Sequence, residues 1–114
     1  MKVRALMLAT LCAASVSPAI AGTQTGFVKD IYIRESDGLI LVDLFGTASG
    51  HPVCAQQPYW VIPNESSETD KRLLALLLAA QLSSRYVTII GTDTCSRWPD
   101  GEDIGTVGMA GQQP

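Results

Sequence analysis

A chain of 114 residues with a formal net charge of −3 has room for one small domain with an acidic surface. Such a surface repels phosphate backbones and anionic lipids, which excludes the usual basic nucleic-acid binders and polybasic membrane anchors. We therefore expect no nucleic-acid partner.

The N-terminal end has the pattern of a cleavable export signal. A basic start precedes an apolar stretch over residues 5–16, which has the length of a signal core and is too short to cross a bilayer. Small residues, Ala19 and Ala21, stand three places and one place before Gly22, as a signal peptidase requires. We expect cleavage of residues 1–21, a secreted or periplasmic location, and one mature domain, residues 22–114, without a membrane span.

The three cysteines reduce to one pair after cleavage. Cys12 leaves with the signal peptide, and lipidation there is disfavoured because Leu11 stands where a small residue is expected. Cys54 and Cys95 remain, and an even count in an oxidising compartment indicates a disulfide. A redox or metal role is the alternative, but there is no C-x-x-C spacing and no second ligand nearby.

A β-hairpin is expected first, with strands at residues 27–35 and 39–46. Asp37-Gly38 favours a two-residue type I′ turn, which would place Ile33 opposite Val42. One face would then be aliphatic and belong to the core. The other face carries the mixed residues Tyr32, Arg34, Asp43 and Phe45. It is either a solvated sheet face or a contact surface.

A third strand is expected over residues 52–62, broken near Gln56-Gln57-Pro58, and a helix over residues 68–83. Ser66 or Ser67 is suited to cap the helix. Residues 73–80 are apolar all round the helix axis, whereas a surface helix shows only a stripe. We therefore predict self-association through the helix, with loops of the same chain covering it as the alternative. The predicted oligomer interface comprises Leu73, Leu76, Leu77 and Ala80.

The chain closes with a β-branched strand at residues 86–91, a loop at 98–103, a weak strand at 104–109 and a frayed end at 110–114. The predicted order is β-β-β-α-β-β. A helix between the third and fourth of five antiparallel strands indicates a mainly β, OB-type barrel, with a simple α+β roll as the alternative.

No arrangement of residues indicates an enzyme. His51, the single histidine, precedes Pro52 in a polar turn, and no nucleophile stands at a spacing that would pair with it. The acidic residues Asp100, Glu102 and Asp103 are typical of a turn around a glycine and lack the other ligands of a calcium loop. We expect no catalytic residue, no metal site and no cofactor.

Aromatic residues beside polar ones are better candidates for ligand binding, because ring faces stack on sugar C–H groups while polar side chains bond hydroxyls. Trp60 is expected in the core. Trp98 lies in a polar Pro-Asp-Gly loop near the second mature cysteine and is the leading recognition residue. The predicted ligand site comprises Trp98, Tyr32, Arg34 and Asp43.

Several features occur together over residues 26–96: an early hairpin, Cys54-Ala55 followed by Trp60, a helix ending in Leu-Ala-Ala-Gln, a Val-Thr-Ile strand, and Cys95. In this order they resemble the B subunits of subtilase-cytotoxin and pertussis-like toxins. The resemblance implies an OB-fold protomer, a ring of five with helices facing a central pore, and a glycan-binding surface. The second, C-terminal disulfide of those subunits has no counterpart, since residues 96–114 contain no cysteine.

The sequence thus predicts an exported, non-enzymatic binding module that forms a homo-oligomer and binds a glycan, a protein or an exported partner subunit. The alternative is a small envelope structural or interaction protein that binds no sugar. A small hydrolase is a third hypothesis.

Overall fold

The computed structural model describes residues 20–109 of the chain. The basic start and the apolar core of the expected signal peptide, and the expected frayed end at 110–114, lie outside the described residues. Between residues 20 and 109, no helix is both long and apolar enough to cross a membrane.

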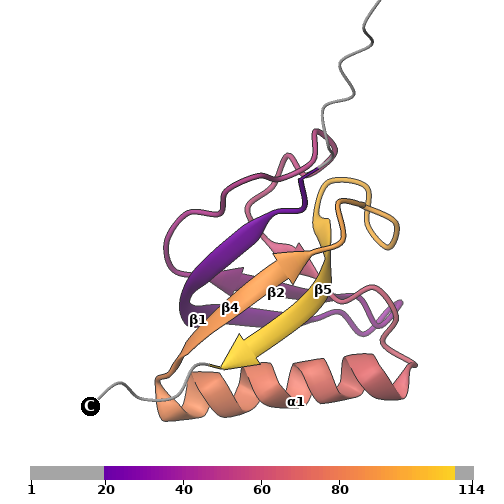
Figure 1. Ribbon diagram of the computed structural model, residues 1–114. Helices are drawn as coiled ribbons and strands as arrows, with labels where there is room; N and C mark the ends of the chain where they lie inside the picture. Colours follow the sequence, from indigo (N-terminus) through magenta and orange to yellow (C-terminus); the bar gives the residue numbers. More distant parts are fainter. Residues whose placement is uncertain (1–19, 110–114) are drawn as a thin grey trace, which may run out of the picture.

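Five strands form a closed barrel with one helix at its end (Figure 1). In chain order the elements are β1 (Thr23–Ile33), β2 (Ile40–Leu44), β3 (Trp60–Val61), α1 (Glu68–Ser83), β4 (Tyr86–Gly91) and β5 (Glu102–Met109). Around the barrel the strands follow the order β1-β2-β3-β5-β4. This mostly β architecture is compatible with an OB-like barrel. The expectation of a wholly antiparallel set is wrong, because β3 and β5 run parallel.

The longest strand, β1, takes part in both halves of the barrel. Its first half pairs with β4 and its second half with β2, and the register shifts between Val28 and Asp30. A bulge of this kind bends and twists a strand, so that β1 can change partners along its length. A side chain at Gly26 would overlap the carbonyl group of Phe45. Because glycine has no side chain, the two backbones can approach closely here.

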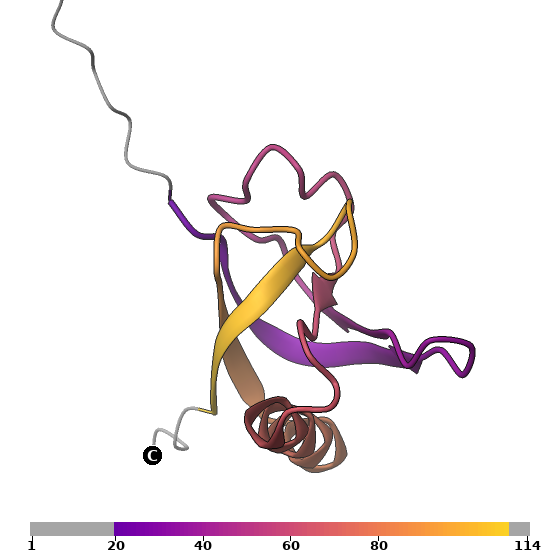
Figure 2. The same ribbon diagram turned by 90° about the vertical axis from the view of Figure 1, so that its right-hand side faces the viewer.

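The expected hairpin register is wrong by two residues. Ile33 pairs with Ile40, and Ile31 rather than Ile33 pairs with Val42. A shift of two keeps every side chain on its own face, because side chains alternate with period two. Val42 therefore stays in the core, but Ile33 is 61% exposed because the hairpin tip projects beyond the barrel (Figure 2).

The turn itself explains the shift. The Arg34 N–H donates to the carbonyl oxygen of Leu39, and the Gly38 N–H donates to that of Arg34, both at 2.8 Å. The Asp37 carboxylate also accepts from the Leu39 N–H at 3.2 Å. A type I′ turn requires a positive φ at both central residues, whereas Gly38 has one (76°) and Asp37 does not. The loop is therefore longer than two residues.

The third strand is much shorter than expected and comprises Trp60 and Val61. Pro52 and Pro58 lack an N–H and cannot extend the ladder, so the residues before Trp60 form a loop. The predicted disulfide Cys54–Cys95 is confirmed, with Cα atoms 6.2 Å apart. It ties this loop to the loop between β4 and β5.

The helix has the predicted bounds, and its ends show why. Ser67 caps the start, with its hydroxyl accepting the Asp70 N–H at 3.1 Å. Ser84 adopts a left-handed conformation (φ 52°) that ends the helix. Figures 1 and 2 show α1 lying across one end of the barrel, where Leu77 and Ala80 enter the core with Trp60.

Candidate functional site

The structure brings the β1–β2 hairpin against the loop that follows Cys95. The guanidinium carbon of Arg34 lies 4.5 Å from the centre of the Trp98 ring, which is half-buried. This is a cation–π contact. Two of the residues predicted for ligand binding thus form one surface, although they are far apart in the sequence. We call it the hairpin–loop surface. It comprises Tyr32, Arg34, Asp37, Arg97 and Trp98.

A bidentate ion pair fixes Arg34 at the edge of this surface. Its Nε and Nη2 atoms donate to the two carboxylate oxygens of Asp37 at 2.8 and 2.6 Å. These hydrogen bonds hold the pKa of Asp37 well below its usual range and raise the pKa of Arg34. The guanidinium plane is therefore oriented before any ligand arrives.

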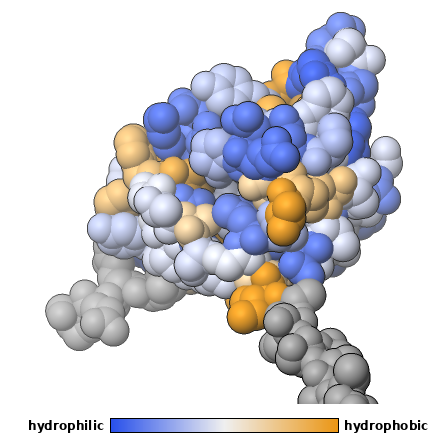
Figure 3. Space-filling model, turned by 90° about the horizontal axis from the view of Figure 1, so that it is seen from above, coloured by the Kyte–Doolittle hydropathy of each residue, from blue (hydrophilic) through white to orange (hydrophobic). Residues whose placement is uncertain are grey.

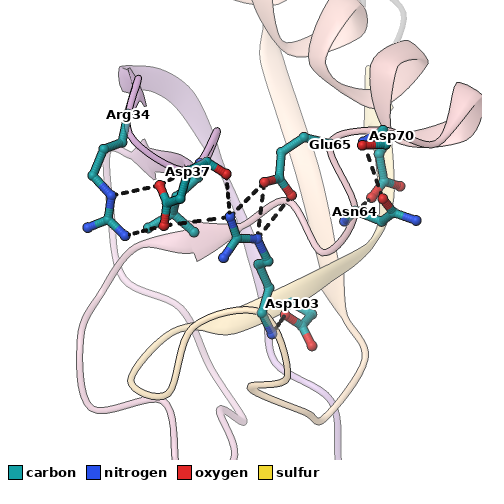
Figure 4. A network of polar contacts seen from close by, with 9 residues as sticks. Arg34, Asp37, Asn64, Glu65, Asp70 and Asp103 are labelled. Carbon is teal, nitrogen blue, oxygen red and sulfur yellow. Dashed lines mark hydrogen bonds and ion pairs between the residues drawn. The ribbon is translucent and has the colours of Figure 1, made fainter.

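Arg97 connects three segments at the hairpin–loop surface. It donates to the Glu65 carboxylate at 2.7 to 3.1 Å and to the backbone carbonyl of Asp37 at 3.0 Å. Its hydrogen bond lowers the pKa of Glu65. Figure 4 shows Arg34, Asp37 and Glu65 in one connected network of polar contacts. The hairpin, the segment before α1 and the Trp98 loop are thus held together.

The Trp98 loop is also fixed from within. The Asp103 carboxylate is 1% exposed and accepts hydrogen bonds from the Thr94 and Ser96 hydroxyls and from the Ser96 and Arg97 N–H groups. On the other side of Trp98, the Tyr59 hydroxyl donates to Asp100. Burial and, to a smaller extent, this hydrogen bond raise the pKa of Tyr59 to about 12.

Tyr32 is 56% exposed and shares the hairpin face with Asp43. The cross-strand partner of Asp43 is Asp30 rather than Tyr32, so Asp43 lies further from Tyr32 and Arg34 than expected. Burial raises the pKa of Asp43, while Lys29 opposes this effect. Asp43 is therefore separated from the Arg34–Trp98 contact. Tyr32, in contrast, is two residues before Arg34 and lies on the same face of the hairpin.

The residues predicted for the oligomer interface face inward. Leu77 and Ala80 are 0% exposed in the core, and Leu73 and Leu76 are partly buried against it. Burial of these apolar side chains against the barrel keeps this side of the helix turned inward. The outward side carries Ala75, Leu78, Ala79 and Leu82. Leu82 is 87% exposed, so the apolar strip that faces solvent lies nearer the C-terminal end of α1.

An exposed aromatic pair was missed at the sequence level. The Phe27 and Tyr86 rings stack with centroids 4.1 Å apart, and the side chains are 37% and 54% exposed. Beside them is a pocket of about 370 Å³, lined by Phe27, Val28, Phe45, Ala80, Gln81 and Ser84. The alternation of β1 would have placed Phe27 on the outer face with Thr25 and Lys29.

The expected turn residue His51 belongs instead to a buried cluster. Its Nδ1 lies 2.8 Å from Oε1 of Glu102, and its ring is 4.8 Å from that of Trp60. The Nε2 atom is buried without a hydrogen-bond partner in the described part of the chain. Glu102 is 0% exposed and also accepts the N–H groups of Asp93 and Gly22. An acidic residue beside a glycine gives no sign in the sequence of such burial.

The barrel end opposite α1 is formed by the two loops that the disulfide joins. Seen from this end, the surface is mainly hydrophilic, with separate apolar spots rather than one continuous patch (Figure 3). Among residues 20–109, no group of three or more His, Cys, Asp or Glu side chains is arranged to hold a metal ion.

Comparisons with protein-family models, with curated proteins and with solved structures found no match.

Proposed function

We propose that the mature protein is an exported, non-catalytic binding module with an OB-like barrel, and that its hairpin–loop surface binds a glycan. The observation that supports this most directly is the Arg34–Trp98 contact at 4.5 Å. It combines an aromatic ring with charged groups that are already oriented, on a surface assembled from distant segments.

The chemistry of this surface suits a sugar. The ring of Tyr32 is 56% exposed and offers a flat face for C–H groups, and the half-buried ring of Trp98 lies against Arg34, two residues further along the chain from Tyr32. The carboxylate of Asp37 and the guanidinium of Arg34 neutralise each other while keeping positions from which hydroxyls can be bonded. Because Arg97 fixes the loop, little ordering entropy would be lost on binding.

We further propose that copies of the domain associate through the C-terminal part of α1 and the neighbouring aromatic pair. Leu82, Phe27 and Tyr86 are exposed apolar residues, and burial of such surface between subunits favours association. A ring of five is the assembly that the toxin-subunit resemblance implies. The same apolar residues also support the second candidate, a small envelope interaction protein with a protein ligand and no sugar binding.

A glycan-array screen of the mature protein tests the main proposal. Trp98→Ala and Tyr32→Ala should each abolish the signal while leaving the far-UV circular dichroism unchanged. Asp43→Asn is the matched control, because it changes a polar residue on the same hairpin away from the contact, and it should bind like the wild type. Binding that survives both aromatic substitutions would contradict this site, and a protein that binds no glycan would favour the envelope interaction protein.

A further inference from the structure

The buried carboxylate of Glu102 faces the residue at which the mature chain is expected to begin. The backbone nitrogen of Gly22 lies 3.2 Å from Oε1 and 3.1 Å from Oε2 of Glu102. Glu102 is 0% exposed, and Gly22 is buried as well. The nitrogen that cleavage after Ala21 would free therefore already lies against both oxygens of a buried acid.

In the uncleaved chain, the groups that contact the Glu102 carboxylate do not provide a permanent positive charge to balance it. The amide nitrogen of Gly22 has one hydrogen for two acceptors and carries no charge. Within residues 20–109, the ion pairs of Glu102 involve His51 alone, which is charged only when its ring is protonated. The Asp93 N–H adds a hydrogen bond at 3.0 Å but no charge. A buried carboxylate without a permanent cationic partner is costly.

We propose that the cluster around Glu102 is a binding site for an α-ammonium group, namely that of the chain's own new N-terminus. Hydrolysis of the Ala21–Gly22 peptide bond by a signal peptidase consumes one water. It leaves a carboxylate on Ala21 and an amine on Gly22, which takes up a proton to become an ammonium group. This group has a hydrogen for each oxygen of Glu102 and a third that points where the carbonyl carbon of Ala21 was. Cleavage thus converts a shared hydrogen bond into a buried ion pair.

Two glycines make room for this pair. A side chain at Gly22 would overlap the Glu102 carboxylate and come within 2.8 Å of Nδ1 of His51. A side chain at Gly91 would also overlap the carboxylate. The Gly91 N–H donates to the carbonyl oxygen of Gly22 at 2.8 Å, so backbone pairing holds Gly22 in position independently of its charge. The ammonium group would enter a site that is already formed.

The consequence is that removal of the signal peptide stabilises the fold. A chain that must cross a membrane unfolded would lack the ion pair, and the exported chain would gain it on cleavage. This inference rests on cleavage after Ala21 and does not depend on the ligand of the hairpin–loop surface.

The test compares the mature chain that begins at Gly22 with the same chain carrying Ala21 in front. The added residue follows a path that the structure already accommodates, so it turns the Gly22 nitrogen back into an amide and moves the ammonium group one residue away from Glu102 without adding a clash. We expect the extension to raise the unfolding equilibrium constant by about tenfold or more, measured by chemical denaturation. In a Glu102→Gln background the same extension should change it by less than about twofold. Equal stabilities with Glu102 intact, or the same loss in both backgrounds, would overturn the proposal.

Two measurements need no substitution in the core, and they decide the matter if Glu102→Gln does not fold. The terminal residue of the exported protein, identified by mass spectrometry, should be Gly22, and any other start would overturn the proposal. The pKa of the Gly22 amine, followed by NMR in specifically labelled protein, should lie above the ordinary value of about 7.7 to 8.0. Glu102 and His51 are the titratable side chains that face it. An ordinary amine pKa would show that no ion pair forms.

Discussion

Trp60 donates its indole N–H to Oε1 of Gln24 at 2.8 Å, and both side chains are buried. The amide nitrogen of Gln24 in turn lies 3.1 Å from the carbonyl oxygen of Gly46 and donates to it. One amide therefore satisfies the polar atom of the largest core side chain and links β1 and β3 to the end of β2.

Gln24→Leu should destabilise the domain by about 1 to 3 kcal/mol, because the buried indole N–H would lose its acceptor. The measurement is the free energy of unfolding from chemical denaturation. Gln56→Leu, on an exposed loop residue, is the control and should change this free energy by less than about 0.5 kcal/mol. If both substitutions cost the same, the hydrogen bond is not a source of stability.

Removal of the disulfide should cost about 4 kcal/mol, since Cys54 and Cys95 are separated by 41 residues and their bond restricts the unfolded chain. The double variant Cys54→Ala/Cys95→Ala should show this loss in denaturant unfolding. The wild type should show the same loss after reduction, while a reductant should not affect the double variant. Two free thiols per native wild-type chain would contradict the bond.

Tyr59 should make the fold sensitive to strongly alkaline pH. Its pKa of about 12 in the folded chain lies above the value of about 10 for an unfolded tyrosine. The protonated hydroxyl therefore contributes fully to stability below about pH 10, and this contribution is lost as the pH rises from about 10 to about 12. Thermal unfolding of wild type and Tyr59→Phe over this range should converge. Parallel curves would mean that the hydroxyl does not couple to folding.

Self-association should depend on the outward side of α1. Leu82→Glu should dissociate the proposed oligomer without unfolding the domain, because this side chain is 87% exposed in one copy. Leu77→Glu is the contrasting variant and should unfold the protein, since it places a charge at a position that is 0% exposed. Sedimentation velocity and circular dichroism distinguish the two outcomes. A wild-type monomer at micromolar concentration would refute the association itself.

The parts of the fold that were predictable are those with local signals. Ser67 and the acidic first turn mark the start of α1, and the β-branched run of β4 gives that strand the expected bounds. The hairpin was predictable in its existence and faces but not in its register, because Asp37 and Gly38 form a longer turn closed through Arg34 and Leu39.

The candidate site was predictable only in part, for a related reason. Trp98 and Arg34 each stood out by residue type, but their contact depends on Arg97 and Glu65, which no sequence pattern connects. Burial of Glu102 was not predictable, because its partners come from three segments and an acidic residue next to glycine is usually in a turn. The side of α1 that packs on the barrel was predicted to be an oligomer interface. Apolar residues lie all round the helix axis, so no single apolar stripe marks the buried side in the sequence.

The closure of the barrel by a two-residue strand has a consequence for its motions. Trp60 pairs with Val42 on one side and with Glu102 on the other, so the short strand β3 connects β2 to β5. Separation of β3 from its neighbours would expose the Trp60 indole ring and the Glu102 carboxylate to water at the same time. Amide hydrogen exchange at Trp60 and Val61 should therefore proceed only when the entire domain unfolds, and the barrel should behave as one cooperative unit whose smallest strand is among its slowest to exchange.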